Sequence, residues 1–249
     1  MSAPPSPQEQ ELSRLRAELQ AARDALGDFA YVVSHDLRAN LRHISAYAGL
    51  VREELGDSTP ADVVSYLDTV TNAAKLMGRQ IDGLMAWSQL DRAELDATTL
   101  DVQALVVEAR HVLAAEAAGR QIDWQVAADL PRLRGDAVLL RQLFAHLLSN
   151  ALKFTRPRAP AVISIGWQPA DEDGLCLLFV RDNGVGFNPQ QQGKLFHVFQ
   201  RLHSASEFEG QGLGLALARK IVERHGGSIR AEGAPDAGCC IRFTLPLAA

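Results

Sequence analysis

A histidine next to a carboxylate is the first pair of residues in this chain whose types and spacing could do chemistry. His35 and Asp36 lie in a segment whose apolar residues recur every three or four positions, as they do on a buried helix face. At about 100° per residue, His35 points roughly 200° away from both Val33 and Leu37, so its imidazole is expected to face water. Such an imidazole could act as a nucleophile; the alternative is a surface histidine without a function.

Two motifs in the second half of the chain could bind parts of a nucleotide. Asn150 and Lys153 are three residues apart on a predicted helix and therefore share a face. An asparagine carbonyl can ligate Mg²⁺, and a lysine can neutralise phosphate. Asp182 follows a predicted strand and precedes Gly184 and Gly186, so it could accept a hydrogen bond from an exocyclic amine while the glycines let backbone approach a flat ligand. Taken singly, a core asparagine beside a solvated lysine and a plain tight turn are the alternatives.

Two further motifs could hold phosphate and close the site. A glycine triplet runs straight into a predicted helix, whose backbone amides and dipole can hold phosphate: Gly210, Gly212 and Gly214. Phe196 and Phe199 precede a polar stretch, residues 204–209, which could form a lid anchored by the two rings. The alternative is a small satellite core under a loop. The glycines follow no strand and lack the downstream acid of a dinucleotide fold, and no Walker-type Gly-Lys-Ser/Thr is present.

The first half of the chain is expected to be helical. Residues 1–8 are rich in proline and serine and are expected to be disordered, and two apolar stripes predict helices over about 9–55 and up to about 92. Between them Gly56 suits a helix end, Thr59 a helix cap and Pro60 a first turn. The stripes comprise Leu12, Leu15, Leu19, Ala22, Leu26, Phe29, Val33, Leu37, Leu41, Ile44, Ala48, Val51 and Leu55, then Val63, Leu67, Val70, Ala74, Met77, Ile81 and Leu84.

Two narrow-striped helices cannot bury their apolar faces alone, so a homodimeric four-helix bundle is expected. The alternative is a hairpin within one chain that packs on the second half. After a link at 95–99, the pattern predicts a mixed sheet with helices on one face. The expected helices cover about 101–118, 136–154 and 213–224, and the expected strands cover 121–127, 161–168, 175–181, 228–232 and 239–246.

Composition narrows the classes of partner and compartment. The 249 residues carry a formal net charge of −5, which argues against a nucleic-acid partner. The 3 cysteines make neither a disulfide framework nor a metal-ligand spacing, which fits a reducing, cytoplasmic setting. No apolar run approaches the roughly 18 residues that span a bilayer, so we expect no membrane insertion.

In this order, the motifs resemble those of the sensor histidine kinases of two-component signalling, over about residues 25–246. The segments that resemble the family's H, N, G1, F and G2 boxes are 34–38, 150–153, 182–186, 196–199 and 210–214. Residues 198–205 are similar to the phytochrome-like branch. The resemblance implies an α + α/β chain: a coiled-coil lead-in (9–27), a dimerisation and histidine phosphotransfer domain (28–95), and a catalytic ATP-binding domain (98–249) with the Bergerat-type (GHKL) α/β sandwich.

The resemblance also implies roles for the motif residues. His35 would be phosphorylated by ATP, with Asp36 as proton acceptor, and would pass the phosphoryl group to an aspartate of a response-regulator receiver domain. Asn150 would hold Mg²⁺, Lys153 the phosphates and Asp182 the adenine amine. The resemblance further assigns to the ATP site Phe154, Gly184, Gly186, Phe196, Phe199, Arg201, Gly210, Gly212 and Gly214. A phosphotransfer scaffold with a decayed ATP domain and an ATPase without a phosphohistidine are the alternatives.

Three positions depart from the family pattern, and one module is missing. The residue five after the histidine, commonly proline, is Asn40; the residue four after it, often a polar residue in members that dephosphorylate their regulator, is Ala39. His146 stands where a second asparagine near the metal is common. No sensory module precedes the bundle, so we expect either a fragment of a longer sensor or a separate sensor protein as a partner.

Overall fold

The computed structural model describes residues 6–56, 59–90, 94–172, 174–204 and 206–248, apart from the side chains of Glu9, Arg16, Arg23 and Leu26. The chain divides into two compact units, residues 1–93 and 94–249. Within the described residues, no helix combines the length and the apolar character that a membrane span requires.

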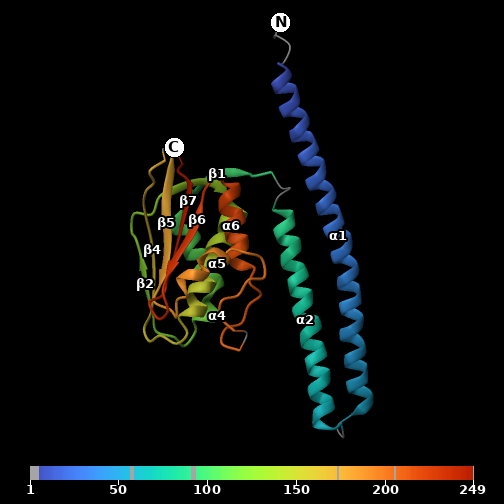
Figure 1. Cartoon of the computed structure of the whole chain (residues 1–249). Coiled ribbons are helices and arrows are strands. Elements are labelled where there is room, and N and C mark those ends of the chain that lie inside the picture. The colour runs from blue at the N-terminus through green and yellow to red at the C-terminus, as the bar shows by residue number, and fades with distance from the viewer. Residues whose placement is uncertain (1–5, 57–58, 91–93, 173, 205, 249) are drawn as a thin grey trace. The chain divides into compact units, whose positions relative to one another are not determined.

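The first unit is a hairpin of two helices, α1 (Pro7–Leu55) and α2 (Ala61–Gln89), which lie side by side (Figure 1). The helix starts earlier than the sequence suggested: Pro7 and Gln8, expected to be disordered, belong to α1. Gly56 ends α1 with a φ of 64°, as a helix-terminating glycine does. The expected cap is wrong, because α2 has Pro60 at its N-cap position with no side-chain bond, and the Thr59 hydroxyl donates to Gly56 O (2.6 Å).

The apolar residues of the hairpin form two faces rather than one stripe. Small side chains pack between the helices, among them Ser34, Ala48 and Ala74, each at most 9% exposed. A second group of large apolar residues lies on the outer surface of the hairpin and is 37–67% exposed, whereas Met85 of α2 is buried. These outer residues include Phe29, Val33, Leu37, Ile44, Val51, Val70, Met77 and Leu84. The predicted stripes therefore combined the residues that join α1 to α2 with residues that the single chain leaves uncovered.

The described residues of the second unit form two sheets and four helices. Its helices are α3 (Val102–Val112), α4 (Ala114–Ala117), α5 (Ala137–Phe154) and α6 (Gly214–Arg224), with a short 3-10 turn at Pro189–Lys194. Its strands are β1 (Ala97–Asp101), β2 (Ile122–Val126), β3 (Arg132–Asp136), β4 (Ala161–Pro169), β5 (Leu175–Asp182), β6 (Ile229–Gly233) and β7 (Cys239–Pro246). The main sheet has the order β2-β4-β5-β7-β6, in which only the β2–β4 pair is parallel. The mixed sheet and the α + α/β fold class are confirmed, and Figure 1 shows α5 and α6 on one face of the sheet.

Two local expectations for this unit are wrong. Residues 97–99, expected to link the units, belong to strand β1, which pairs antiparallel with β3, a strand that the pattern did not predict. The helix expected over 101–118 is broken at Leu113 into α3 and α4. The remaining predicted helices and strands differ from the observed ones by one or two residues at their ends.

Helix α5 and strand β5 are packed into the core along most of their length, and the predicted motifs lie at their C-terminal ends. The α5 helix begins at the Asp136 cap, whose Oδ1 accepts from Val138 N (2.9 Å) and Leu139 N (3.1 Å). Its apolar face, with Phe144 edge-to-face against Phe243 of β7, is fully buried. Strand β5 alternates, so the inward series that fills the core ends on a carboxylate: Cys176, Leu178, Val180 and Asp182.

Candidate functional site

His35 lies on the outer surface of α1 with a side chain that is 65% exposed. Its Nδ1 lies 3.3 Å from Asp36 Oδ1, so the carboxylate is placed to accept a proton from this nitrogen. The predicted exposure of the imidazole matches the structure, but Val33 and Leu37 are exposed too, and the buried neighbour is Ser34. This histidine is therefore accessible to a reactant that approaches from solvent.

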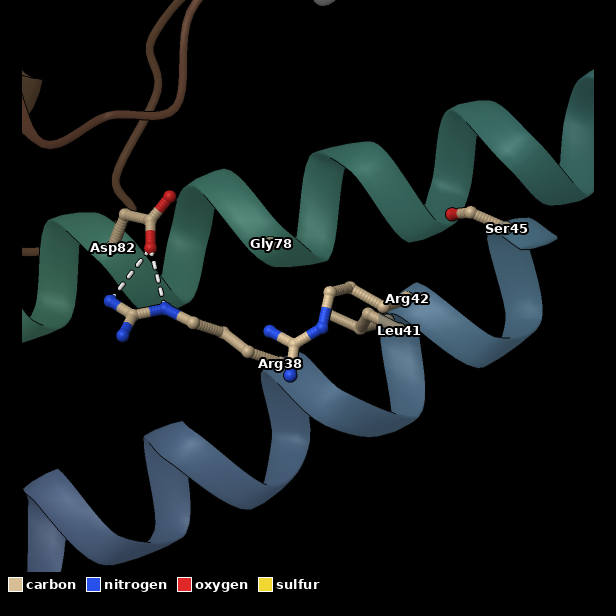
Figure 2. Close-up of a pocket in the computed structure, with 6 residues that line it drawn as sticks. All are labelled: Arg38, Leu41, Arg42, Ser45, Gly78 and Asp82. Carbon is tan, nitrogen blue, oxygen red and sulfur yellow. Dashed lines mark hydrogen bonds and ion pairs between the residues drawn. The ribbon is translucent and has the colours of Figure 1, made fainter.

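A groove between α1 and α2 begins one helical turn from His35 (Figure 2). Arg38 donates from Nε to Asp82 Oδ1 (2.8 Å), an exposed ion pair that links the two helices and contributes little to stability. The groove measures about 330 Å³, and its lining consists of Arg38, Leu41, Arg42, Ser45, Gly78 and Asp82. The surface next to His35 is thus cationic and partly apolar.

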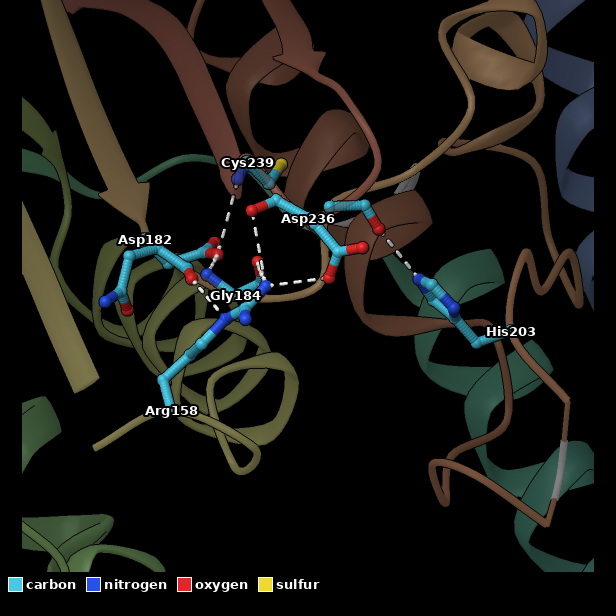
Figure 3. A network of polar contacts seen from close by, with 8 residues as sticks. Arg158, Asp182, Gly184, His203, Asp236 and Cys239 are labelled. Atoms are coloured by element: carbon cyan, nitrogen blue, oxygen red, sulfur yellow. Dashed lines mark hydrogen bonds and ion pairs between the residues drawn. The ribbon is translucent and has the colours of Figure 1, made fainter. Parts of the chain in front are cut away.

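Asp182, at the end of β5, is the buried carboxylate of the second unit, with 8% of its surface exposed. Its Oδ1 accepts from Gly184 N (2.8 Å) and from Cys239 N (3.3 Å), as Figure 3 shows. Burial raises the pKa of Asp182 to about 6, against the opposing effect of these two backbone donors. Its Oδ2 accepts no hydrogen bond from the described residues, so it remains available to a donor on a ligand.

The glycines after Asp182 allow this loop to lie against two other segments. A Cβ on Gly184 would lie 2.6 Å from Phe154 O, and a Cβ on Gly186, whose φ is 64°, would lie 1.9 Å from Ala234 O. Val185 N donates to the same Phe154 O (3.2 Å), which joins the loop to the end of α5. The two predicted motifs are therefore in contact, and side chains larger than hydrogen are excluded at both glycines.

On α5, three polar side chains reach toward the glycine triplet. A Cβ on Gly214 would lie 3.6 Å from His146 Nδ1 and 3.8 Å from Asn150 Nδ2, and a Cβ on Gly210 would lie 3.2 Å from Lys153 Nζ. Burial lowers the pKa of Lys153, and the Glu209 carboxylate partly offsets that effect. Burial also lowers the pKa of His146, which favours its neutral imidazole. The structure thus brings Asn150, Lys153 and the glycines together, as the motif order predicted.

The segment between the two phenylalanines and the glycines packs on Phe154. The rings of Phe154, His203 and Phe208 form a cluster with centroids 5.1–5.3 Å apart. His203 Nε2 also lies 2.9 Å from Gly186 O. One of the two expected anchors differs: Phe199 is 41% exposed with a φ of 63°, and its backbone N donates to Gly212 O (2.9 Å). Phe208 and His203 are therefore the side chains that fasten this lid.

Arginines brace the lid and the glycine loop. Arg201 donates to the carbonyl oxygens of Ser204 and Phe208, and Arg156, just beyond α5, forms a two-pronged ion pair with Glu209. The Arg156 guanidinium lowers the pKa of the Glu209 carboxyl to about 2. Together they fix both ends of the lid segment.

Arg158 fastens the glycine loop from the other side. It donates to Asn183 O (3.0 Å), Gly184 O (3.2 Å) and Asp236 Oδ1 (2.9 Å), as Figure 3 shows. The sequence interpretation singled out Arg201 alone among these bracing residues. The partners that it missed, Arg156, Arg158, His203, Phe208, Glu209 and Asp236, have no local pattern, because each acts through a contact distant in the sequence.

The polar groups at this site fit a metal ion that arrives with a phosphate ligand. Among the described residues, no group of three or more His, Cys, Asp or Glu side chains could hold a metal ion by itself. Mg²⁺ needs only one or two protein oxygens when phosphates and water supply the rest. Asn150, whose side chain has no hydrogen-bond partner among the described residues, is available for that role.

Comparisons with known proteins identify a family model and relatives that this chain resembles. Residues 135–249 match the family model described as "Histidine kinase-, DNA gyrase B-, and HSP90-like ATPase". The phytochrome-like protein Cph1 of Synechocystis is 32% identical over 242 residues, which cover 96% of this chain and 32% of the relative. The methanogenesis regulatory histidine kinase FilI of Methanothrix harundinacea is 33% identical over 236 residues, which cover 95% of this chain and 26% of the relative. The chain thus spans about a third or less of these relatives.

Solved structures share the fold. Full-length ShkA, solved in complex with AMPPNP, has a TM-score of 0.64 at 23% identity, with 89% of this chain and 46% of that chain covered. The mycobacterial sensor histidine kinase MprB has a TM-score of 0.52 at 24% identity, with 61% of this chain and 97% of that chain covered.

Proposed function

Since this chain belongs to the sensor histidine kinases, we propose that it transfers the γ-phosphoryl group of ATP to its own His35 and then to an aspartate of a response-regulator receiver domain. One observation supports the proposal most. Four segments that are far apart in the sequence meet around the C-terminal half of α5; they contain Asn150, Asp182, Phe208 and Gly214. The side chain of Asn150 and the Oδ2 atom of Asp182 have no hydrogen-bond partner there among the described residues.

The residues of this site suit the parts of ATP. Asp182 Oδ2 can accept from the adenine amine in a buried setting, where a hydrogen bond to a charged group is strong. Lys153 and the backbone amides before α6 can hold the phosphates, and Asn150 can hold Mg²⁺. When bound, Mg²⁺ neutralises phosphate charge. The lid braced by Arg201 can then exclude water from the phosphates.

His35 and Asp36 can divide the phosphoryl-transfer chemistry between them. With the Nδ1 proton directed at Asp36, the lone pair of Nε2 is free to attack the γ-phosphorus. The Nε2–P bond forms while the bond from the γ-phosphorus to the β–γ bridging oxygen breaks, and ADP leaves with that electron pair. Asp36 takes the Nδ1 proton, which leaves a neutral phosphoimidazole. In such phosphoryl transfers, the groups of the protein mainly position the reactants and neutralise the charge on the phosphates.

In the second transfer, the bond between His35 and the phosphorus breaks again. A receiver carboxylate oxygen bonds to the phosphorus, the Nε2–P bond breaks, and the imidazole regains its Nδ1 proton from Asp36. The exposure of His35 on the outer surface of α1 gives a receiver domain access to it. We propose a homodimer as the working unit, because the outer apolar residues of the hairpin are uncovered in one chain. A separate sensor protein acting on α1 is a further proposed partner.

The test is incorporation of label from γ-³²P-ATP into the full chain. We expect an acid-labile label that His35→Gln abolishes while ATP binding persists. His43→Gln, an exposed histidine of the same helix, is the matched control and should label normally. Asn150→Asp should lose Mg-ATP binding and labelling together. An unlabelled wild type that binds ATP would favour the scaffold alternative, and label that survives in His35→Gln would refute the assignment of the nucleophile.

A further inference from the structure

His146 is a half-buried histidine that the proposed chemistry does not use. It lies one helical turn before Asn150 on α5, and both side chains face Gly214, at 3.6 and 3.8 Å from the position of its absent Cβ. Neither side chain has a hydrogen-bond partner among the described residues. Neither side chain has a fully buried atom without a partner, so the polar atoms of both are open to solvent and to a ligand that enters beside Gly214.

The other two shielded histidines of this unit are engaged. His203 bonds Gly186 O, and the buried His225 accepts from Asp136 N (3.0 Å) and donates to Ile221 O (2.8 Å). Among these three, only His146 has ring nitrogens that bond no described residue. Its position next to Asn150 places an imidazole nitrogen beside an amide that can ligate a cation.

The pair cannot hold an ion without further ligands. Among the described residues, no group of three or more His, Cys, Asp or Glu side chains could hold a metal ion, and Lys153 adds positive charge one turn on from Asn150. A cation can therefore bind here only together with an anion such as a triphosphate, which places it in the ATP site of the proposed function.

We propose, on the basis of that ATP site, that His146 gives an imidazole nitrogen to the nucleotide-bound metal ion and shifts the site's preference from Mg²⁺ toward a divalent transition ion such as Mn²⁺. Mg²⁺ is a hard ion that prefers oxygen, whereas transition ions gain affinity from an imidazole ligand. An imidazole nitrogen in place of an amide oxygen therefore shifts the preference of the site toward the transition ion.

The first test compares nucleotide affinity with the two ions. A non-hydrolysable ATP analogue is titrated into the full chain with Mg²⁺ or with Mn²⁺, for wild type, His146→Asn and the exposed control His111→Asn. We expect wild type and the control to bind the Mn²⁺ complex about tenfold more tightly, and His146→Asn to lose that preference. Equal affinities of wild type for both complexes would overturn the inference and leave the proposed function intact. Failure to bind either complex would overturn both.

The second test detects the nitrogen directly and needs only the wild type. Electron spin echo spectra of the Mn²⁺–nucleotide complex are recorded with protein that carries ¹⁴N or ¹⁵N histidine. A coupling that changes with the histidine isotope supports the inference even if His146→Asn does not fold. A spectrum that is insensitive to the isotope shows that the metal has no histidine ligand and overturns it.

Discussion

Replacement of the buried carboxylate, Asp182→Asn, should stabilise the second unit while it weakens ATP binding. Burial raises the pKa of Asp182 from 3.8 to about 6, so the native state prefers the protonated acid. Asparagine keeps an oxygen at Oδ1 to accept from Gly184 N and Cys239 N, but it carries no charge. The carboxylate is thus suited to the ligand rather than to stability.

The magnitude follows from the difference between the two pKa values. A rise of this size corresponds to about 3 kcal/mol at neutral pH. A group whose pKa is raised in the native state stabilises fully below its unfolded pKa, and this contribution disappears as pH rises through about 6. At pH 7 the variant should therefore be more stable than wild type by up to about 3 kcal/mol, and the gap should shrink as pH falls toward 4. Loss of a hydrogen bond to a charged group should weaken ATP binding by about 10- to 100-fold.

Urea denaturation of the full chain, followed by circular dichroism at pH 7, 6 and 5, measures the first effect. Titration of an ATP analogue at pH 7 measures the second. The reasoning is refuted if Asp182→Asn unfolds at the same or lower urea concentration than wild type at pH 7. A gap that stays constant over the three pH values would show that the gain does not come from the carboxyl's ionisation.

Three further changes test the glycine loop, the proposed dimer and the charge beside Lys153. Gly186→Ala should lower the urea midpoint of unfolding, because the glycine has a φ of 64° and the added Cβ would lie 1.9 Å from Ala234 O. Gly193→Ala should not, because the added Cβ would have open space around it. The double change Val70→Glu and Met77→Glu should give monomers in sedimentation at micromolar concentration. Val112→Glu, which alters an exposed valine of the other unit, should leave the dimer intact. Unchanged sedimentation of the double variant would contradict the proposed dimer. Glu209→Gln should raise ATP affinity several-fold, because it removes negative charge beside Lys153, and added salt should diminish this effect. Glu207→Gln, in the same segment, is the control. An equal rise in affinity in the control would contradict the reasoning.

Long elements were predictable because their periodicity accumulates over many residues. The two hairpin helices and α5 are of this kind, and the motif residues stand at their expected places on them. Strands β1 and β3 were not predictable. In β3, Arg132 and Arg134 point outward, and Leu133 is the single large apolar side chain that points inward. Their extended form depends on pairing with each other, which a local pattern does not reveal.

The site was predictable where a residue type is required locally, and not where contacts join distant segments. The glycines beside Asp182 and before α6 are needed for close approach, so their positions could be recognised. The lid is fastened by Phe208 and His203 rather than by Phe199, because the path of the loop decides which ring reaches Phe154. Likewise, the apolar stripe of α1 did not show which residues face α2 and which remain on the outer surface.

Helix α1 runs without a break from Pro7 to Leu55, so a rotation at its N-terminal end can turn the whole helix. Its 49 residues extend over about 73 Å, and about 42 Å of continuous backbone separates Pro7 from His35. Asn40 keeps its backbone donor where a proline would remove one, so no hinge absorbs a twist near the histidine. A rotation of about 20° moves a side-chain tip about 6 Å from the axis through about 2 Å. Since a misplacement of about 1 Å can cost roughly a hundredfold in rate, a small rotation of α1 would be enough to move the His35 imidazole in or out of line for the attack proposed above.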